Sequence, residues 1–139
     1  MKLLRFFMLM LAIILISCSV NKKLSKVDIQ KEAEVSDSVE YELIIFDPGF
    51  ESWFISHCKP SWYHSQEYYE LWNRQYVSAW NEKVISPRFS RFFESTIEYD
   101  PFTDYGLELN HKLFYYFMYV ERALKINILP PGAGPQTIF

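Results

Sequence analysis

The residues best suited to chemistry in this sequence are a few histidines and cysteines gathered in the middle of the chain. His57, Cys58 and His64 lie close together, and His111 follows later. Nitrogen and sulfur ligands of this kind can bind zinc. However, zinc ligands are usually spaced by about two to four residues, and adjacent side chains rarely reach one ion. We therefore expect solvated or hydrogen-bonded histidines, with no metal site and no cofactor.

A serine or cysteine nucleophile is a second possibility in the same segment. Cys58 or Ser61 could attack a substrate with His64 as the general base. Neither residue lies in a glycine-flanked nucleophile elbow or in another known local context of a nucleophile. The sequence therefore favours Ser61 as the cap of a turn or helix, with His64 in a first turn.

A pair of carboxylates is the third possibility, because two acids across a sugar-binding groove can hydrolyse glycosides. The acids that could contribute are Glu51, Glu94, Glu98, Asp100 and Asp104. Acids among aromatic residues are also common on ordinary protein surfaces. We therefore expect a protein that is not an enzyme, and a hydrolase is the least favoured of the functions considered.

Aromatic residues are the most unusual feature of the composition. The chain of 139 residues contains 12 phenylalanines, 10 tyrosines and 4 tryptophans, nearly all of them between Tyr41 and Tyr119. This density excludes a disordered chain and supplies enough area for one small hydrophobic core. We expect most of these rings in that core.

Some aromatic residues are candidates for binding, because exposed Trp and Tyr rings stack on sugars and are enriched in protein interfaces. The candidates are Trp53, Trp62, Tyr63, Tyr115, Met118 and Tyr119. The first three lie in a segment interrupted by glycine and proline, and they would bind a glycan. The last three lie on a predicted helix whose outer side is not polar, and they would form a patch for a protein partner.

The start of the chain has the pattern of a bacterial lipoprotein signal. Lys2 and Arg5 precede an uncharged stretch over residues 6–16 that is too short to span a bilayer as a helix. Leu15-Ile16-Ser17-Cys18 follows and resembles the lipobox, in which a diacylglycerol is attached to the cysteine. This predicts a membrane anchor through lipid on Cys18, and Cys58 then has no disulfide partner within the chain.

Length and charge limit the organisation of the chain. The length allows one domain, and a formal net charge of −3 without clustered Lys and Arg excludes a nucleic-acid partner. The predicted segments are a signal peptide at 1–17, the lipidated cysteine and a flexible tether at 18–39, a single domain at 40–129 and a flexible tail at 130–139.

Hydrophobic patterning predicts an α+β domain, with a small antiparallel sheet packed by two amphipathic helices. The predicted elements are a strand over 40–46, a turn at 47–49, a loop over 50–60, a helix over 66–84 capped by Ser65, a half-buried strand over 89–99, a loop over 100–106, a helix over 107–125 and a short strand over 126–129. The second helix is apolar on most sides. We therefore expect its own sheet or a partner to cover both sides.

Three motifs suggest a family. They are Asp47-Pro48-Gly49-Phe50-Glu51-Ser52-Trp53, Trp72-Asn73-Arg74-Gln75-Tyr76-Val77 and Asp104-Tyr105-Gly106-Leu107-Glu108-Leu109-Asn110. Together they resemble a family of small bacteroidete lipoproteins of unknown function, over roughly residues 40–124. The resemblance implies a location in the envelope of a Gram-negative cell, facing the periplasm or the exterior. It implies no catalytic residues.

The sequence as a whole therefore predicts a membrane-anchored envelope lipoprotein whose domain binds a protein partner or assists assembly. The alternative is a glycan-binding module that uses exposed Trp and Tyr side chains.

Overall fold

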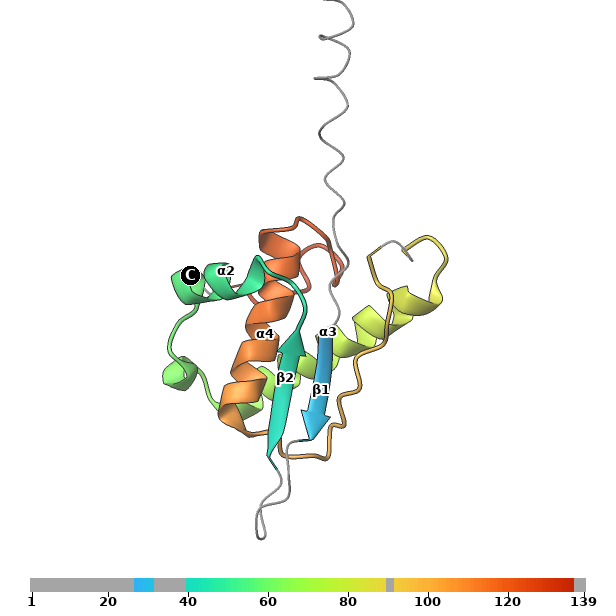
Figure 1. Cartoon of the computed structure of the whole chain (residues 1–139). Coiled ribbons are helices and arrows are strands. Elements are labelled where there is room, and N and C mark those ends of the chain that lie inside the picture. Colours follow the sequence, from blue (N-terminus) through green and yellow to red (C-terminus); the bar gives the residue numbers. More distant parts are fainter. Residues whose placement is uncertain (1–26, 32–39, 90–91, 137–139) are drawn as a thin grey trace, which may run out of the picture.

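The computed structural model describes residues 27–31, 40–89 and 92–136. Its elements in chain order are strand β1 (Val27–Lys31), strand β2 (Tyr41–Ile45), helix α2 (Phe50–His57), the short 3₁₀ helix η1 (Ser61–Tyr63), helix α3 (Gln66–Ile85) and helix α4 (Gly106–Arg122) (Figure 1). The predicted signal peptide, Cys18 and most of the predicted tether lie outside the described residues.

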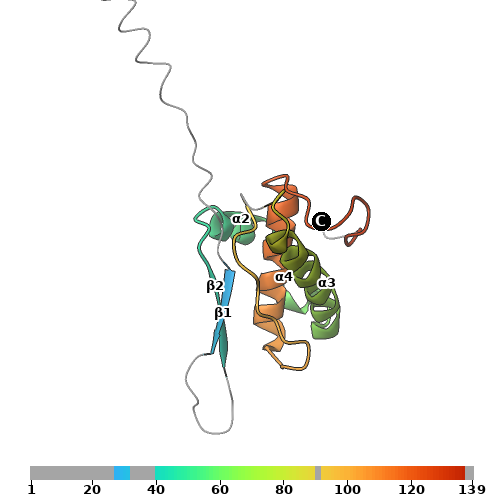
Figure 2. The same cartoon turned by 90° about the vertical axis from the view of Figure 1, so that its right-hand side faces the viewer.

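Helix α4 lies in the middle of the molecule. The β1–β2 hairpin and α2 cover one side of it, and α3 covers the opposite side (Figure 2). Every residue from Leu109 to Val120 except Lys112 is buried. A helix covered in this way needs apolar residues around most of its circumference, and the sequence of α4 provides them. The predicted α+β fold is confirmed, and the chain's own sheet and helices cover both sides of α4.

The sheet is a two-stranded antiparallel hairpin in which Val27 lies opposite Ile45 and Lys31 lies opposite Tyr41. The strand predicted over 40–46 is therefore confirmed as β2. Strand β1, however, lies inside the segment predicted to be a flexible tether, so that prediction is wrong for residues 27–31. Its two apolar residues, Val27 and Ile29, pack against the core. Two such residues are too few to give a recognisable alternating pattern in the sequence.

Helix α2 replaces most of the loop predicted over 50–60, so this prediction is also wrong. Phe50, Trp53 and Phe54 recur at the spacing of one helix face, and all three pack into or against the core. The preceding turn is correctly predicted: the backbone N–H of Phe50 donates to the carbonyl of Asp47, and that of Gly49 donates to the Asp47 carboxylate. The domain therefore has a third helix that the hydrophobic patterning missed.

Helix α3 matches its prediction within one residue at its C-terminal end. The Ser65 hydroxyl accepts a hydrogen bond from the backbone N–H of Tyr68 at 3.3 Å, which confirms Ser65 as the N-cap. The buried face carries Tyr69, Tyr76 and Trp80 as expected. Trp72 is only partly buried, whereas its neighbour Asn73 is completely buried.

The strand predicted over 89–99 is absent from the described residues of that segment. Burial does alternate along it, since Phe93 and Ile97 are buried while Glu94, Thr96 and Glu98 are exposed. Side chains of α3, rather than another strand, bind its backbone. Asn81 accepts from the Ile97 N–H at 2.9 Å and donates to the Ile97 carbonyl at 3.1 Å, and Trp80 Nε1 donates to the Ser95 carbonyl. The alternating pattern therefore predicted correctly which side chains of this segment are buried. The strand pairing that it also predicted is absent from the described residues.

The short strand predicted over 126–129 is also absent. The Glu121 carboxylate, in the last turn of α4, accepts the backbone N–H groups of Ile128 and Leu129 at 3.0 and 2.9 Å. The chain turns after Arg122, and Lys125 has a positive φ of 59°, so α4 ends before the predicted residue 125. The next residues fold back over the molecule, and Pro135 is buried.

We predict that Asn81→Ala destabilises the domain, because it removes both hydrogen bonds to Ile97 and leaves two partly buried backbone groups without these partners. Such a loss costs about 1–3 kcal/mol in the free energy of unfolding. Urea unfolding of the full chain measures it. Asn127→Ala, which changes an exposed asparagine, is the control and should alter the free energy by no more than about 0.5 kcal/mol. Equal effects of the two variants would contradict the prediction.

Candidate functional site

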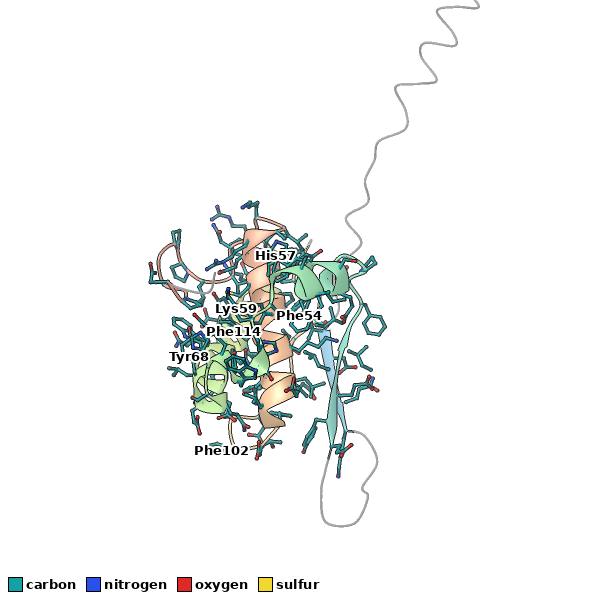
Figure 3. All side chains as sticks on the ribbon, turned by 90° about the vertical axis from the view of Figure 1, so that its left-hand side faces the viewer. Phe54, His57, Lys59, Tyr68, Phe102 and Phe114 are labelled. Atoms are coloured by element: carbon teal, nitrogen blue, oxygen red, sulfur yellow. The ribbon has the colours of Figure 1, made fainter. Side chains whose placement is uncertain are left out.

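The histidine-rich segment is held against α4 by the backbone of Lys59. The Tyr115 hydroxyl accepts the Lys59 N–H at 2.9 Å, and His111 Nε2 lies 2.8 Å from the Lys59 carbonyl oxygen. A carbonyl oxygen only accepts, so Nε2 of His111 carries the proton. Burial lowers the pKa of His111. His111 is therefore a neutral residue that fixes the connection between α2 and η1, in which Lys59 is labelled in Figure 3.

His64 lies among aromatic rings at the start of α3. Its ring stacks on Tyr68 with centroids 3.9 Å apart, and Tyr63 and Tyr69 meet it edge-on. Its Nε2 atom is buried and has no hydrogen-bond partner among the described residues. Burial also lowers the pKa of His64, which favours the neutral ring at neutral pH.

The structure does not join the residues of the proposed nucleophilic pair. The Ser61 hydroxyl donates to the Glu108 carboxylate at 2.6 Å rather than to His64. Cys58 ends α2 through its backbone, which donates to the Phe54 carbonyl, and partial burial raises the pKa of its thiol. Within residues 27–31, 40–89 and 92–136, no three His, Cys, Asp or Glu side chains are grouped in a way that could bind a metal ion.

Three of the acids considered for catalysis have local structural partners. Glu51 pairs with Lys112 at 2.7 Å. Asp100 accepts from the backbone of Phe102 and from the Thr103 hydroxyl, and the first of these bonds is the main cause of its lowered pKa. Asp104 accepts from the Gly106 N–H, with the same effect on its pKa. The bonds of Asp100 and Asp104 organise the connection into α4.

The predicted partner patch on α4 is wrong. Tyr115 and Met118 are each 1% exposed and Tyr119 is 6% exposed. Rings of α2 cover the two tyrosines, Phe54 on Tyr115 and Phe50 on Tyr119. A side chain covered by its own domain cannot contact a partner. Tyr119 instead donates to the Asp47 carboxylate at 3.1 Å, and its burial raises its pKa to about 12.

The three predicted glycan-binding aromatics are on two elements. Trp53 belongs to α2, is partly buried and stacks parallel to His57 at 4.7 Å. Trp62 and Tyr63 are on η1, and they are 76% and 51% exposed. Of the three predicted glycan-binding rings, the two neighbours Trp62 and Tyr63 therefore remain as an exposed pair.

A groove of about 600 Å³ lies between the C-terminal half of α3 and the segment that follows α4. Its lining includes the apolar residues Ala79, Phe89, Phe93, Ile126, Ile128, Leu129, Pro130 and Pro131, with Glu82, Lys83 and Asn127 among them. A second, more open hollow of about 420 Å³ continues along α3 and shares Ala79, Glu82 and Leu129. We call the two together the α3 groove.

Sequence reasoning missed the α3 groove. One wall is the segment after α4, whose position depends on the hydrogen bonds to Glu121 and follows from no local pattern. A partial signal was present on α3 itself: Leu71 and Ala79 interrupt its polar side, and Leu71 is 50% exposed.

A family model, described as a family of unknown function (DUF6146), matches residues 6–132. The chain belongs to this family. No curated protein and no solved structure matches the chain.

In this DUF6146 protein, two of the three motifs noted in the sequence attach neighbouring segments to α4. In the first, Gly49 lies so close to Tyr119 that an added Cβ would come within 2.6 Å of its hydroxyl oxygen. In the second, the buried Asn73 amide donates to both the backbone and the side chain of Asn110.

The third motif forms the start of α4. Gly106 has a positive φ of 76°, which favours glycine, and its N–H donates to Asp104. The motif ends at Asn110, whose side chain also accepts from the Tyr99 hydroxyl at 2.7 Å. Gly49, Asn73 and Asn110 of these motifs therefore hold neighbouring segments against α4.

We predict that this DUF6146 domain becomes less stable as the pH falls from about 7.5 to about 5.5. Burial lowers the pKa of folded His111 below the ordinary value of 6.5, so the unfolded chain binds more protons in this range. His111→Gln, which keeps a donor for the Lys59 carbonyl, should reduce the loss. Urea unfolding at the two pH values measures it, with His57→Gln on the exposed end of α2 as the control. An equal reduction in both variants would contradict a specific role of His111.

Proposed function

We propose that the protein is a lipid-anchored lipoprotein of the cell envelope whose domain binds a protein partner. The charged start, the short apolar stretch and the lipobox-like Leu15-Ile16-Ser17-Cys18 support the anchor. The resemblance to bacteroidete lipoproteins supports an envelope of the Gram-negative type. Among the described residues, no helix has the length and hydrophobicity needed to cross a bilayer.

The α3 groove is the observation that carries the binding function. It is mainly apolar, it is open to solvent, and Glu82 and Lys83 on its border provide polar contacts for orientation. Exposed Leu71 extends the apolar surface at one end of it. Protein interfaces combine an apolar centre with a polar border in this way. Lys83 lies 4.3 Å from the centre of the Phe89 ring, so one wall is held by a cation–π contact.

The alternative function is glycan binding at η1. Trp62 and Tyr63 expose neighbouring rings, and the Ser61–Glu108 pair beside them offers polar groups that bind sugar hydroxyls. Trp53, the third predicted ring, belongs to a different element. Glycan binding therefore ranks second.

The anchor predicts the behaviour of a Cys18→Ser variant. Without the thiol, no diacylglycerol can be attached, and the chain should be misprocessed or released from the membrane fraction. Fractionation of cells and the intact mass of the purified chain measure this loss. Cys58→Ser is the matched control and should stay with the membranes. Unchanged membrane association of Cys18→Ser, or a wild-type mass without lipid, would refute the anchor.

The groove predicts specific cross-links in cells. A photoreactive amino acid at position 71 or 75 of the full chain should give protein adducts of defined mass. Position 102, which is 96% exposed and outside the groove, should not. Ala79→Glu places a charge in the groove and should abolish these adducts, whereas Phe102→Glu should not.

Two outcomes would contradict the groove as the binding site. One is the absence of adducts from both groove positions, and the other is their persistence in Ala79→Glu. Binding of peptidoglycan fragments that is lost in Trp62→Ala but kept in Ala79→Glu would support the glycan alternative instead.

A further inference from the structure

The described domain begins at the end of the molecule where α2 lies. Val27 starts β1 and lies opposite Ile45, the last residue of β2. The chain then passes through Phe46 and the turn at residues 47–49 into α2. The start of β1, the end of β2 and α2 are therefore neighbours at one end of the hairpin (Figure 1).

The distance from this end to the lipid is short. Cys18 and Val27 are nine residues apart in the sequence. A fully extended chain spans at most about 3.3–3.6 Å per residue, so the nine residues reach no more than about 32 Å. This limit holds for any conformation of the intervening residues. A domain of this size has a radius of gyration of about 13 Å, so it stays within roughly one diameter of the bilayer.

Two exposed apolar side chains lie at this end. Phe46 is 56% exposed immediately after β2, and Ile55 is 78% exposed on α2. Ile55 lies on the outer face of α2, because Phe50, Trp53 and Phe54 form the inner face against the core. The nearby carboxylate of Glu51 is paired with Lys112 at 2.7 Å, which offsets its charge.

From this juxtaposition we infer that Phe46 and Ile55 insert into the phospholipid surface that holds the lipidated chain. The inference rests on the proposed lipid on Cys18. Apolar side chains of a surface helix enter the boundary between headgroups and acyl chains. Two side chains would bind a bilayer weakly by themselves, but the short connection makes their insertion intramolecular and raises the effective concentration of lipid.

The same geometry orients the binding site. Helix α2 and the hairpin lie on one side of α4, and α3 lies on the other (Figure 2). Insertion of Phe46 and Ile55 thus puts lipid at the α2 end of the molecule, with the α3 groove on the opposite side of α4 from α2 and the hairpin. Phe102 provides an internal comparison, because it is 96% exposed but lies at the opposite end of the molecule from α2 (Figure 3).

The test uses the lipidated full chain with Cys58→Ser, reconstituted in vesicles of phosphatidylethanolamine and phosphatidylglycerol. A nitroxide label is attached in turn to Phe46→Cys, Ile55→Cys and Phe102→Cys. Paramagnetic resonance then compares contact of each label with oxygen, which enriches in lipid, and with a nickel chelate, which stays in water. Labels at 46 and 55 should show a higher oxygen-to-nickel ratio than the label at 102.

A second variant checks the result by changing a residue of the surface, Ile55, while the label stays at position 46. The Ile55→Asp variant should still carry its lipid and remain in the membrane fraction. The label at position 46, however, should lose its protection from the nickel chelate. Phe102→Asp should leave that protection unchanged. Circular dichroism and gel filtration confirm that each variant is folded.

Three results would overturn the inference. Equal ratios at all three positions in vesicles would show that this end does not touch lipid. Protection that grows with protein concentration in the absence of vesicles would show that a second copy covers it. Protection lost on adding competing soluble protein, with the lipid unchanged, would assign the surface to a protein partner. The mass of the lipidated chain is read independently, so failure of the anchor is distinguished from failure of insertion.

Discussion

The structure depends on one constraint: α4 is buried almost completely and still carries polar side chains. A buried polar group without a hydrogen bond is costly, and five polar side chains of α4 bind surrounding segments. Asn110 binds Asn73 of α3, Tyr115 and His111 bind the backbone of Lys59, Tyr119 binds Asp47, and Glu121 binds the segment after the helix. The requirement of α4 for partners therefore fixes the position of almost every other segment.

This constraint explains why the core is aromatic. A tyrosine fills core volume with its ring and carries a hydroxyl to the edge of the core, where a leucine would offer no donor. Tyr76 shows both roles, because its ring stacks on Phe117 at 5.0 Å and its hydroxyl donates to Glu121. Burial and the nearby carboxylate raise the pKa of Tyr76, which keeps the hydroxyl protonated as a donor. The same Glu121 binds the backbone N–H groups of Ile128 and Leu129, so one carboxylate joins α3, α4 and one wall of the groove.

The sequence predicted those features that depend on local patterning. Helix α3, its Ser65 cap, strand β2 and the turn at Asp47 all follow from residues close to one another in the chain. The features that it missed depend on distant side chains. The extended segment around Ile97 has the alternation of a strand, but Asn81 binds its backbone in place of a neighbouring strand. The predicted partner patch on α4 was wrong for a similar reason. A helix buried in the core and a helix at an interface have similar compositions, so the sequence does not distinguish them until the segment that covers the helix is known. Here the residues concerned were Tyr115, Met118 and Tyr119. In this chain that segment, α2, was itself missed.

The central position of α4 also separates two surfaces of the domain. Segments on the hairpin side are attached through Asp47 and Lys59, whereas α3 and the groove are attached through Asn73 and Glu121. The residues of α4 that make these two sets of hydrogen bonds lie on different turns and different faces of the helix. A domain tethered at Val27 therefore presents its groove from a fixed frame, rather than from a loop whose orientation varies. With the lipid proposed on Cys18, the short connection to Val27 would limit which way this frame, and the groove with it, can face at a membrane.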